Sequence, residues 1–239
     1  MKQKKIIIIG ASSGIGKEMA KIYAQHNLVA ISGRRNDLLL QLQNQYPEAI
    51  IPFCFDVTGI GNIAHLQSMI KRLGGLDLLI YNAGFGDPSK ELNCESEIIT
   101  TKTNVNGFVE IVSWTFNYFV QQGHGQIAIT SSVAALRGNS WAPAYSASKA
   151  FMSNYAEGLN IKAKRMVKDI VITDIKPGFV DTKLAKGNTR FWTSSPQKAA
   201  RQIVRAIVKR KRSAYITRRW WLVAQLLKIL PYSLYRRFA

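Results

Sequence analysis

The sequence predicts a doubly wound α/β fold, in which helices cover both faces of a parallel sheet. Its 239 residues are 47% hydrophobic, which is enough for one large domain with a sizeable core. An uninterrupted apolar run at Lys5–Ile9 leads directly into a glycine-rich turn and an amphipathic segment. Short apolar runs and helical patterns then alternate with short joins, which is typical of parallel strands connected by helices.

The elements are expected in the following order. Strands are predicted at Lys5–Ile9, Leu28–Ser32, Ile50–Phe55, Leu76–Tyr81, Ile170–Ile175 and Ala214–Thr217. Helices are predicted at about 17–26, 37–46, 60–72 and 196–211, and another follows Tyr145, where apolar residues recur with a helical period. No repeat, low-complexity tract or Pro/Gly-rich linker divides the chain. We therefore predict one domain at 1–217 and a C-terminal extension at 218–239.

The formal net charge of +19 is distributed unevenly. Residues 182–239 contain 15 Lys and Arg and no Asp or Glu, whereas residues 1–181 contain 18 basic and 14 acidic residues. Such an asymmetry indicates a basic C-terminal part that meets an acidic partner.

Cysteine and histidine usage argues against a disulfide framework and against a metal site. Cys54 and Cys94 are too few and too far apart for either, and they suggest a reducing compartment. The histidines, at 26, 65 and 124, share no ligand spacing, so we expect no metal. The apolar run at Lys5–Ile9 is too short for a signal peptide or a membrane span, and we expect a cytoplasmic protein.

A glycine-rich turn, Gly10-Ala11-Ser12-Ser13-Gly14-Ile15-Gly16, follows the first strand. A strand, a glycine turn and a helix together present backbone N–H groups and the positive end of the helix dipole to a phosphate. The spacing is G-x-x-x-G-x-G rather than the G-x-G-x-x-G of the dinucleotide fingerprint. A glycine turn without a ligand is the alternative.

Two arginines follow the second strand, in Gly33-Arg34-Arg35. In dinucleotide-binding folds an acidic residue about 20 positions after the glycine turn binds the ribose 2′-hydroxyl, whereas an arginine accommodates a 2′-phosphate. Arg34 stands 20 residues after Gly14, and no carboxylate occurs between Glu18 and Asp37. We therefore predict that the protein prefers NADP(H) to NAD(H). The alternative is a solvated arginine at the start of a helix.

Tyr145 and Lys149 are four residues apart on the predicted helix, so they share one face with about 5–6 Å between their β-carbons. A lysine ammonium beside a tyrosine hydroxyl lowers a pKa that is otherwise about 10, which makes an acid or base usable near neutral pH. Alone, the pattern also fits a surface lysine beside a half-buried tyrosine.

Taken in order, these motifs resemble the single-domain type of the short-chain dehydrogenase/reductase family. They are GASSGIG at 10–16, Asp56-Val57, Asn82-Ala83-Gly84, Asn104, Ser132, Tyr145-x-x-x-Lys149 and Pro177-Gly178. The resemblance runs from about Lys5 to Thr217. It implies a Rossmann-type sheet of seven parallel strands in the order 3-2-1-4-5-6-7. It also implies an oxidoreductase that interconverts a carbonyl and a secondary alcohol.

The resemblance implies a role for each matching position. The implied cofactor-binding residues are Gly10, Ser12, Ser13, Gly14, Ile15, Gly16, Asp56, Val57, Asn82, Ala83, Gly84, Pro177, Gly178 and Thr182, together with Arg34, Tyr145 and Lys149. Tyr145 would be the catalytic acid or base, and Ser132 would bind the substrate carbonyl. Lys149 would lower the pKa of Tyr145 and bind the nicotinamide ribose. Asn104 would hold a relay water through its backbone carbonyl.

Three positions qualify the match. Ile9 replaces the threonine that is usual before the first glycine, and Tyr81 replaces the first asparagine of the N-N-A-G motif. Both are supporting positions. Asn106 competes with Asn104 for the relay role, and Asn104 is preferred because it stands three residues before Gly107.

The extension places Trp220 and Trp221 beside arginines. The apolar stretch Trp220–Leu230 is far shorter than the roughly 20 residues of a membrane span. Its composition favours a helix lying on an anionic membrane surface. A helix over the substrate cleft and a subunit contact are the alternatives. Nucleic acid fits less well, because apolar clusters interrupt the basic residues.

The segment Thr182–Ser195 would form a short lid over the substrate, with Phe191 and Trp192 as its large apolar residues. Such a lid suits a hydrophobic lipid-, acyl- or steroid-like carbonyl or alcohol, although loop packing explains it equally well. Family analogy suggests a homo-oligomer. A non-catalytic nucleotide-sensing module and a membrane-surface adaptor are the alternatives to an enzyme, and the intact Ser132, Tyr145 and Lys149 set favours the enzyme.

Overall fold

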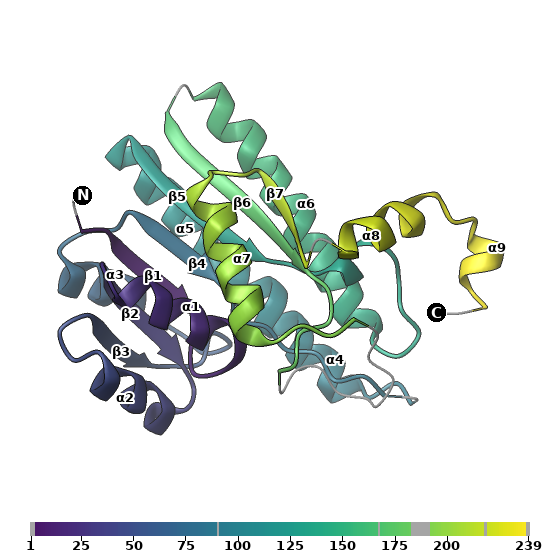
Figure 1. Ribbon diagram of the computed structural model, residues 1–239, viewed down its shortest axis with the longest axis horizontal. Coiled ribbons are helices and arrows are strands. Elements are labelled where there is room, and N and C mark those ends of the chain that lie inside the picture. Colours follow the sequence, from purple (N-terminus) through teal and green to yellow (C-terminus); the bar gives the residue numbers. More distant parts are fainter. Residues whose placement is uncertain (1–2, 90, 167, 183–191, 218, 238–239) are drawn as a thin grey trace.

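A seven-stranded parallel sheet forms the centre of the molecule (Figure 1). The computed structural model describes residues 3–89, 91–166, 168–182, 192–217 and 219–237. The strands are β1 (Lys5–Ile9), β2 (Leu28–Gly33), β3 (Ile50–Cys54), β4 (Leu78–Tyr81), β5 (His124–Thr130), β6 (Asp169–Pro177) and β7 (Ser213–Ile216). They lie in the order β3-β2-β1-β4-β5-β6-β7, which confirms the predicted fold class and strand order.

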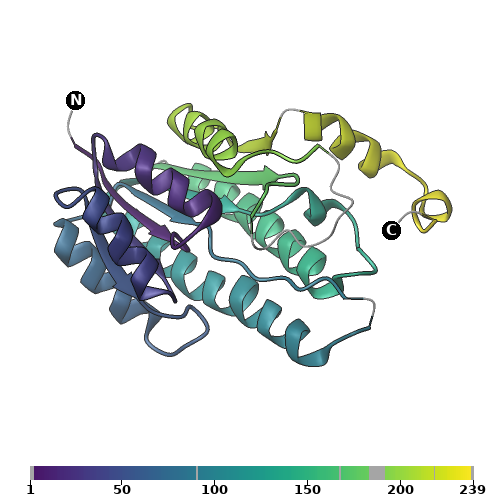
Figure 2. The same ribbon diagram turned by 60° about the horizontal axis from the view of Figure 1, so that its bottom comes forward.

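Helices cover both faces of this sheet. They are α1 (Gly14–Ala24), α2 (Asn36–Gln45), α3 (Asn62–Leu73), α4 (Cys94–Thr101), α5 (Gly107–Gln122), α6 (Pro143–Arg165), α7 (Pro196–Val208), α8 (Arg219–Ile229) and α9 (Tyr232–Tyr235). A π-helical turn, η1 (Lys102–Asn106), joins α4 to α5, and a 3-10 turn, η2 (Val133–Leu136), follows β5. Figure 2 shows α1 and α7 on one side of the sheet and α5 and α6 on the other.

The isoleucines of β1 explain why the core has two halves. Successive side chains of a strand point to opposite faces. Ile6 and Ile8 accordingly pack into one apolar cluster with residues of α1, α2 and α7. Ile7 and Ile9 pack into the other cluster with residues of α3, α5 and α6. A strand that is buried on both faces therefore reads as a continuous apolar run.

The carboxyl ends of the parallel strands meet at one edge of the sheet. The segments that leave this edge are the glycine turn after β1, Arg34 and Arg35 after β2, the loop 82–86 after β4, Ser131 and Ser132 after β5, and residues 178–182 after β6. In open α/β sheets this edge is where ligands bind.

The C-terminal extension is helical, as α8 and α9. These helices lie past the end of β7, at the side of the molecule opposite the N-terminus (Figure 1). No helix in the described part of the chain combines the length and the apolar character that a bilayer crossing requires.

Candidate active site

The glycine turn between β1 and α1 packs tightly against the loop that follows β4. Gly10 has a φ of +86°, and a β-carbon there would lie 2.6 Å from the Ala83 Cα. A β-carbon on Gly16 would lie 2.1 Å from the Gly10 carbonyl oxygen. Only glycine fits these two positions. The helix α1 begins at Gly14, earlier than predicted, and its N-terminus lies at the carboxyl edge of the sheet.

Asn82 joins the ends of three strands beneath the glycine turn. Its side-chain amide donates to the Gly10 carbonyl at 2.8 Å, and its side-chain oxygen accepts from the Thr130 hydroxyl at 3.2 Å. Its backbone N–H donates to the Ile9 carbonyl at 2.9 Å. The ends of β1, β4 and β5 are therefore held in one arrangement.

The two arginines after β2 contact different parts of the edge. The Arg35 guanidinium donates to the hydroxyls of Ser12 and Ser13 at 2.8 and 2.7 Å. Arg34 instead lies 3.6 Å from the Asp56 carboxylate, and both of those side chains are largely exposed. The sequence singled out Arg34 and missed Arg35, although the Arg34-Arg35 pair was the available signal. Both guanidinium groups lie beside predicted cofactor-binding residues.

The hydroxyls of Ser132 and Tyr145 meet across two elements. Ser132 is the N-cap of η2, and its hydroxyl oxygen accepts from the Ala134 N–H at 3.0 Å. Tyr145 lies in the first turn of α6, which Pro143 opens. The Ser132 hydroxyl donates to the Pro177 carbonyl at 3.5 Å, and it lies close enough to the Tyr145 hydroxyl to lower the pKa of Tyr145. The pair can bind one oxygen atom between them and exchange a proton with it.

Burial dominates the proton chemistry of Tyr145 and Lys149. It raises the pKa of Tyr145 above the ordinary value, and the hydrogen bond with Ser132 acts in the opposite direction. Lys149 is 3% exposed, and burial lowers its pKa to about 8. The expected lowering of the Tyr145 pKa is therefore not what the structure shows. Lys149 does not lower the pKa of Tyr145 because its ammonium donates to the Thr130 carbonyl at 2.9 Å and lies 5.7 Å from the Tyr145 ring centre.

Asn104 lies on the π-helical turn η1 and is fully buried. Its side-chain oxygen accepts from the Phe85 N–H at 2.9 Å, and its amide donates to the Phe85 carbonyl at 2.8 Å and to the Ser148 hydroxyl at 2.9 Å. The side chain therefore clamps the loop 82–86 to α6. The resemblance implied a role for the backbone carbonyl and gave no indication of this clamp, nor of the π-helical turn, a feature that is frequent at functional sites.

The loop 82–86 contacts the Tyr145 and Lys149 side chains directly. A β-carbon on Gly84 would lie 3.2 Å from the Lys149 ammonium nitrogen. A β-carbon on Gly86 would lie 2.4 Å from the Tyr145 ring, closer than such atoms approach. The sequence analysis missed Gly86, whose only signal is its place two residues after Asn82-Ala83-Gly84.

Tyr81, which departs from the family pattern, supports the same region. Its hydroxyl donates to the Thr103 carbonyl at 2.9 Å, next to Asn104. Its ring packs edge-on against Phe108 with 5.2 Å between centroids. The substitution therefore keeps a hydrogen bond from β4 to η1.

The segment after β6 reaches the glycine turn. A β-carbon on Gly14 would lie 3.1 Å from the Thr182 methyl carbon, so Thr182 lies beside the predicted phosphate-binding turn. The Asp181 N–H donates to the Ser194 carbonyl at 2.9 Å, and the Ser194 N–H donates to the Phe179 carbonyl at 3.0 Å. Most of the predicted lid, 183–191 with Phe191, lies outside the described residues. Trp192 is described and is partly exposed.

Trp220 of α8 covers the Pro177-Gly178 turn. A β-carbon on Gly178 would lie 2.2 Å from the indole ring, and the Phe179 ring packs edge-on against it at 5.3 Å. Trp220 is 8% exposed. The sequence analysis left open whether the extension covers the cleft or contacts something else, and this side of α8 packs on the edge of the site.

Asp56 and Val57 follow β3, as predicted. The Asp56 carboxylate accepts from the Thr58 N–H and hydroxyl at 2.9 Å each, and the Val57 carbonyl accepts from the Asn62 amide at 3.0 Å. The predicted site residues thus come together at one edge of the sheet. Within the described ranges, no three His, Cys, Asp or Glu side chains are grouped so that they could hold a metal ion.

Comparison with protein families identifies the chain. The family model described as "short chain dehydrogenase" matches residues 4–191, which is most of the sequence. The chain belongs to the short-chain dehydrogenase family. Membership confirms the predicted class of enzyme, an NAD(P)-dependent oxidoreductase that acts on CH–OH groups.

Relatives and solved structures agree with this assignment. An "uncharacterized oxidoreductase" of Myxococcus xanthus is 32% identical over 195 residues, covering 79% of this chain and 76% of the relative. A short-chain dehydrogenase of Burkholderia cenocepacia in complex with NADP superposes with a TM-score of 0.83 at 18% identity and covers 98% and 97% of the two chains. A 3-ketoacyl-(acyl-carrier-protein) reductase of Brucella melitensis complexed with NADH gives 0.79 at 20% identity and covers 89% and 96%. These two structures share the short-chain dehydrogenase fold with this chain.

Proposed function

We propose that this protein uses NADP(H) to interconvert a hydrophobic carbonyl compound and its secondary alcohol. The observation that carries the proposal is the meeting of Ser132 and Tyr145 at the carboxyl edge of the sheet, where the Ser132 hydroxyl lowers the pKa of Tyr145 and Lys149 is buried. A nicotinamide dinucleotide fits this edge, because Gly10 and Gly16 make room for close backbone approach. Arg35 contacts the glycine turn, and Arg34 lies beside Asp56.

The residues have distinct roles in this proposal. When bound, the nicotinamide supplies or accepts the hydride. Ser132 holds the substrate oxygen, and Tyr145 gives its hydroxyl proton to that oxygen during reduction. Lys149 holds a proton within reach of Tyr145. Asn104 keeps the loop 82–86 against α6, so that Tyr145 stays in place.

The preference for NADP(H) rests on Arg34 and Arg35. Arg35 donates to two neutral hydroxyls in the glycine turn, and a phosphate would be a stronger acceptor for its guanidinium. The exposed contact of Arg34 with Asp56 contributes little, so Arg34 can turn to a phosphate at small cost. Each charge-assisted bond to a phosphate is worth about 1.5–3 kcal/mol.

Fluorescence titration of the purified protein with each nucleotide tests this preference. Arg34→Ala and Arg35→Ala should each weaken NADPH binding by about 10- to 100-fold and leave NADH binding nearly unchanged. Arg72→Ala, in the last turn of α3 and remote from the glycine turn, is the matched control. A wild-type protein that binds NADH more tightly than NADPH would contradict the assignment.

The proposed hydrophobic substrate is supported by Phe179 and Trp192, which are large and partly exposed. Phe179 follows the Pro177-Gly178 turn directly, and Trp192 stands two residues before Ser194, whose N–H donates to the Phe179 carbonyl. Turnover should be measured on a series of methyl ketones of increasing chain length. Each CH₂ that becomes buried adds about 0.8 kcal/mol, so kcat/KM should rise about fourfold per carbon until the site is filled. A decrease with chain length from the shortest ketone would contradict the proposal.

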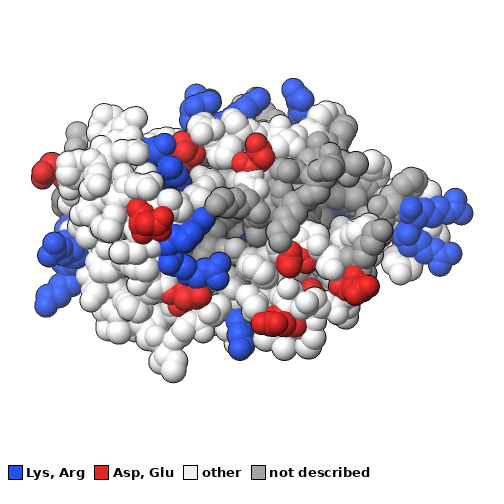
Figure 3. Space-filling view, turned by 90° about the horizontal axis from the view of Figure 1, so that it is seen from below, with Lys and Arg blue, Asp and Glu red and all other residues white. Residues whose placement is uncertain are grey.

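We also propose that the extension docks the enzyme on an anionic membrane surface. While Trp220 and Ala224 of α8 are buried, Leu222, Leu226 and Ile229 are exposed at the spacing of one helical face. Figure 3 shows basic side chains gathered at the outer end of the tail. An exposed apolar stripe beside basic residues fits anionic lipid better than water.

Vesicle sedimentation tests this docking. The wild-type protein should sediment with anionic vesicles at low salt and be released at high salt, because salt screens the basic residues. Replacing Leu222, Leu226 and Ile229 together by Gln should abolish sedimentation while turnover of small ketones persists, and Ile60→Gln, an equally exposed position elsewhere, should not. Failure of the wild-type protein to sediment at low salt would rule the docking out.

A further inference from the structure

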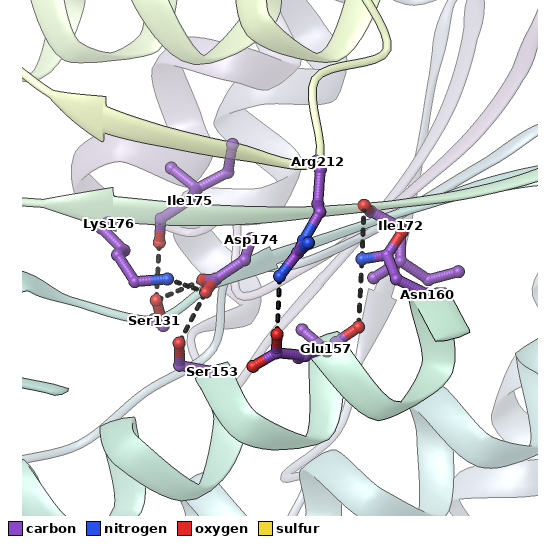
Figure 4. Close-up of polar contacts among 10 residues, drawn as sticks. Ser131, Ser153, Glu157, Asn160, Ile172, Asp174, Ile175, Lys176 and Arg212 are labelled. Carbon is purple, nitrogen blue, oxygen red and sulfur yellow. Dashed lines mark hydrogen bonds and ion pairs between the residues drawn. The ribbon is translucent and has the colours of Figure 1, made fainter. Parts of the chain in front are cut away.

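Asp174 on β6 carries a buried carboxylate to which the proposed reaction gives no role. It is 5% exposed, and its ion-pair partner Lys176 is 8% exposed. One carboxylate oxygen accepts from the Ser131 hydroxyl, and the other accepts from the Ser153 hydroxyl at 2.7 Å and contacts the Lys176 ammonium (Figure 4). Both oxygens are therefore fully engaged.

These contacts join the elements that carry the reacting hydroxyls. Ser131 immediately precedes Ser132 at the end of β5, and Ser153 lies one helical turn after Lys149 on α6. Asp174 itself stands three residues before Pro177. The carboxylate is thus a single point at which β5, β6 and α6 are fixed to one another.

Packing alone does not account for an ion pair at this position. Burying two charges costs several kcal/mol of desolvation per ion, and apolar side chains of similar volume often give equal or greater stability. The flanking strand residues Ile172 and Ile175 are fully buried apolar side chains, so the sheet accepts such residues here. The desolvation cost of burying the Asp174 charge is therefore explained by an effect of this charge on the candidate active site.

That effect acts on Lys149. Burial lowers the pKa of Lys149, and the negative charge of Asp174 acts in the opposite direction. The titratable or charged side chains around Lys149 can be taken element by element. They are Tyr145 on its own helix, Asp174 with Lys176 on β6, Glu97 of α4, which accepts from the Ala144 N–H, and the buried neutral Tyr81 of β4. From β5, the Thr130 carbonyl accepts from the Lys149 ammonium at 2.9 Å, and from η1, the Asn104 side-chain oxygen accepts from the Phe85 N–H.

We propose that Asp174 is a positioning residue for the reaction proposed above, which places a negative charge one helical turn from Lys149 and fixes Ser132 relative to α6. This inference rests on the proposed function for its catalytic meaning. Asp174 acts through its contacts with Ser131, Ser153 and Lys176.

Titration of the Lys149 side chain tests the charge without requiring turnover. The protein is labelled with ¹³C at the lysine ε-carbons, and the Lys149 signal is assigned by its loss in Lys149→Met. Its midpoint is then followed with pH in the wild type, in Asp174→Asn and in Lys176→Met. Arg212→Gln is the matched control, because Arg212 forms an exposed ion pair with Glu157 of α6 near the same cluster (Figure 4).

The two charge variants should shift the midpoint in opposite directions. Asp174→Asn removes the attracting charge and should lower the midpoint by about one pH unit, whereas Lys176→Met removes a repelling charge and should raise it. Arg212→Gln should leave it unchanged. Loosened packing alone would move both variants the same way, toward the ordinary lysine value. Equal midpoints in all proteins, or shifts of one sign, would overturn the proposal. Because loosened packing would also raise the midpoint of Lys176→Met, the lowering in Asp174→Asn decides, and Asp174→Ser replaces that variant if it does not fold.

Turnover separates this inference from the function on which it rests. With the methyl ketone that gives the highest wild-type rate, the fall of kcat at high pH should begin about one pH unit lower in Asp174→Asn. If the NMR midpoints shift as expected and no carbonyl is reduced by the wild type, the proposed function fails and the charge assignment stands. If turnover is normal and its pH profile is unchanged in Asp174→Asn, the positioning role is wrong.

Discussion

Tyr145 and Lys149 are both buried, and burial moves their proton affinities in opposite directions. It raises the pKa of the Tyr145 hydroxyl, because a phenolate loses water, and lowers that of the Lys149 ammonium to about 8, because an ammonium loses water. The ammonium thus becomes the more acidic of the two groups. In the proposed reaction, the return of a proton from Lys149 to the Tyr145 phenolate would therefore be favourable.

The same burial makes Lys149 a cost to stability. Its pKa is about 8 in the folded chain and about 10.4 in an unfolded one, so between these pH values the unfolded chain binds more protons and stability rises with pH. At pH 7 the whole penalty is present. Lys149→Met should therefore raise the free energy of unfolding at pH 7 by about 1–3 kcal/mol and abolish turnover. Thermal melts at pH 7 and above pH 10 check this: the difference should shrink at the higher pH, and a lower melting temperature at pH 7 would contradict it.

Gly86 is expected to set the position of the Tyr145 ring. A methyl group at Gly86 would lie 2.4 Å from that ring, so Gly86→Ala should displace it and reduce kcat by at least about tenfold, as small misplacements of reacting groups do. NADPH affinity should change little. Gly158→Ala is the matched control, because a β-carbon there meets nothing within 4 Å. Equal kcat values for Gly86→Ala and the wild type would show that the ring does not depend on this glycine.

At the scale of elements, α8 is attached to the site through one face. Trp220 packs on Gly178 and Phe179, and Arg137 of the segment after η2 donates to the Leu227 carbonyl and stacks on the Tyr235 ring at 4.7 Å. The helix therefore supports the Pro177-Gly178 turn on its inner side and exposes apolar residues on its outer side. Cleft covering and membrane docking are thus compatible roles for α8.

Substitution of Trp220 and Trp221, one at a time, distinguishes the buried face of α8 from its exposed face. Trp220→Ala should lower the free energy of unfolding by about 3–5 kcal/mol, the usual cost of removing a buried tryptophan, and should raise the KM for ketones by loosening the turn. Trp221→Ala, at a largely exposed position, should change stability by less than about 0.5 kcal/mol. Thermal melts and ketone kinetics measure both, and equal melting temperatures for the two variants would contradict the packing of Trp220 on Gly178.

The elements that could be predicted are those whose signal is local. The isoleucines of β1, the glycine turn and the period after Tyr145 each depend on neighbours in sequence, and all three are confirmed. Other side chains contact residues that are distant in the sequence. Asn104 contacts Phe85 and Ser148, which are 19 and 44 residues away, and Arg35 contacts Ser12. Trp220 packs on Gly178, and no local pattern indicates these contacts. The opposite pKa shifts of Tyr145 and Lys149 likewise come from burial in the assembled fold.

Across the whole molecule, two apolar cores fix one sheet, and the sheet brings distant motifs to one edge. Residues from β1, β2, β4, β5 and β6 meet there although they are spread from Gly10 to Thr182. The strand order therefore determines which side chains meet at the candidate active site. The basic extension, 218–239, lies outside this sheet.

Turnover of Tyr145→Phe tests the central claim most directly. The substitution keeps the ring and removes only the hydroxyl that would give a proton to the substrate. Oxidation of NADPH is followed by absorbance with the ketone that the wild type reduces fastest, and NADPH binding is titrated in parallel. Loss of the general acid should reduce kcat by at least about 100-fold with NADPH affinity nearly unchanged. A kcat within a few-fold of the wild type would show that Tyr145 is not the proton donor and would contradict the account.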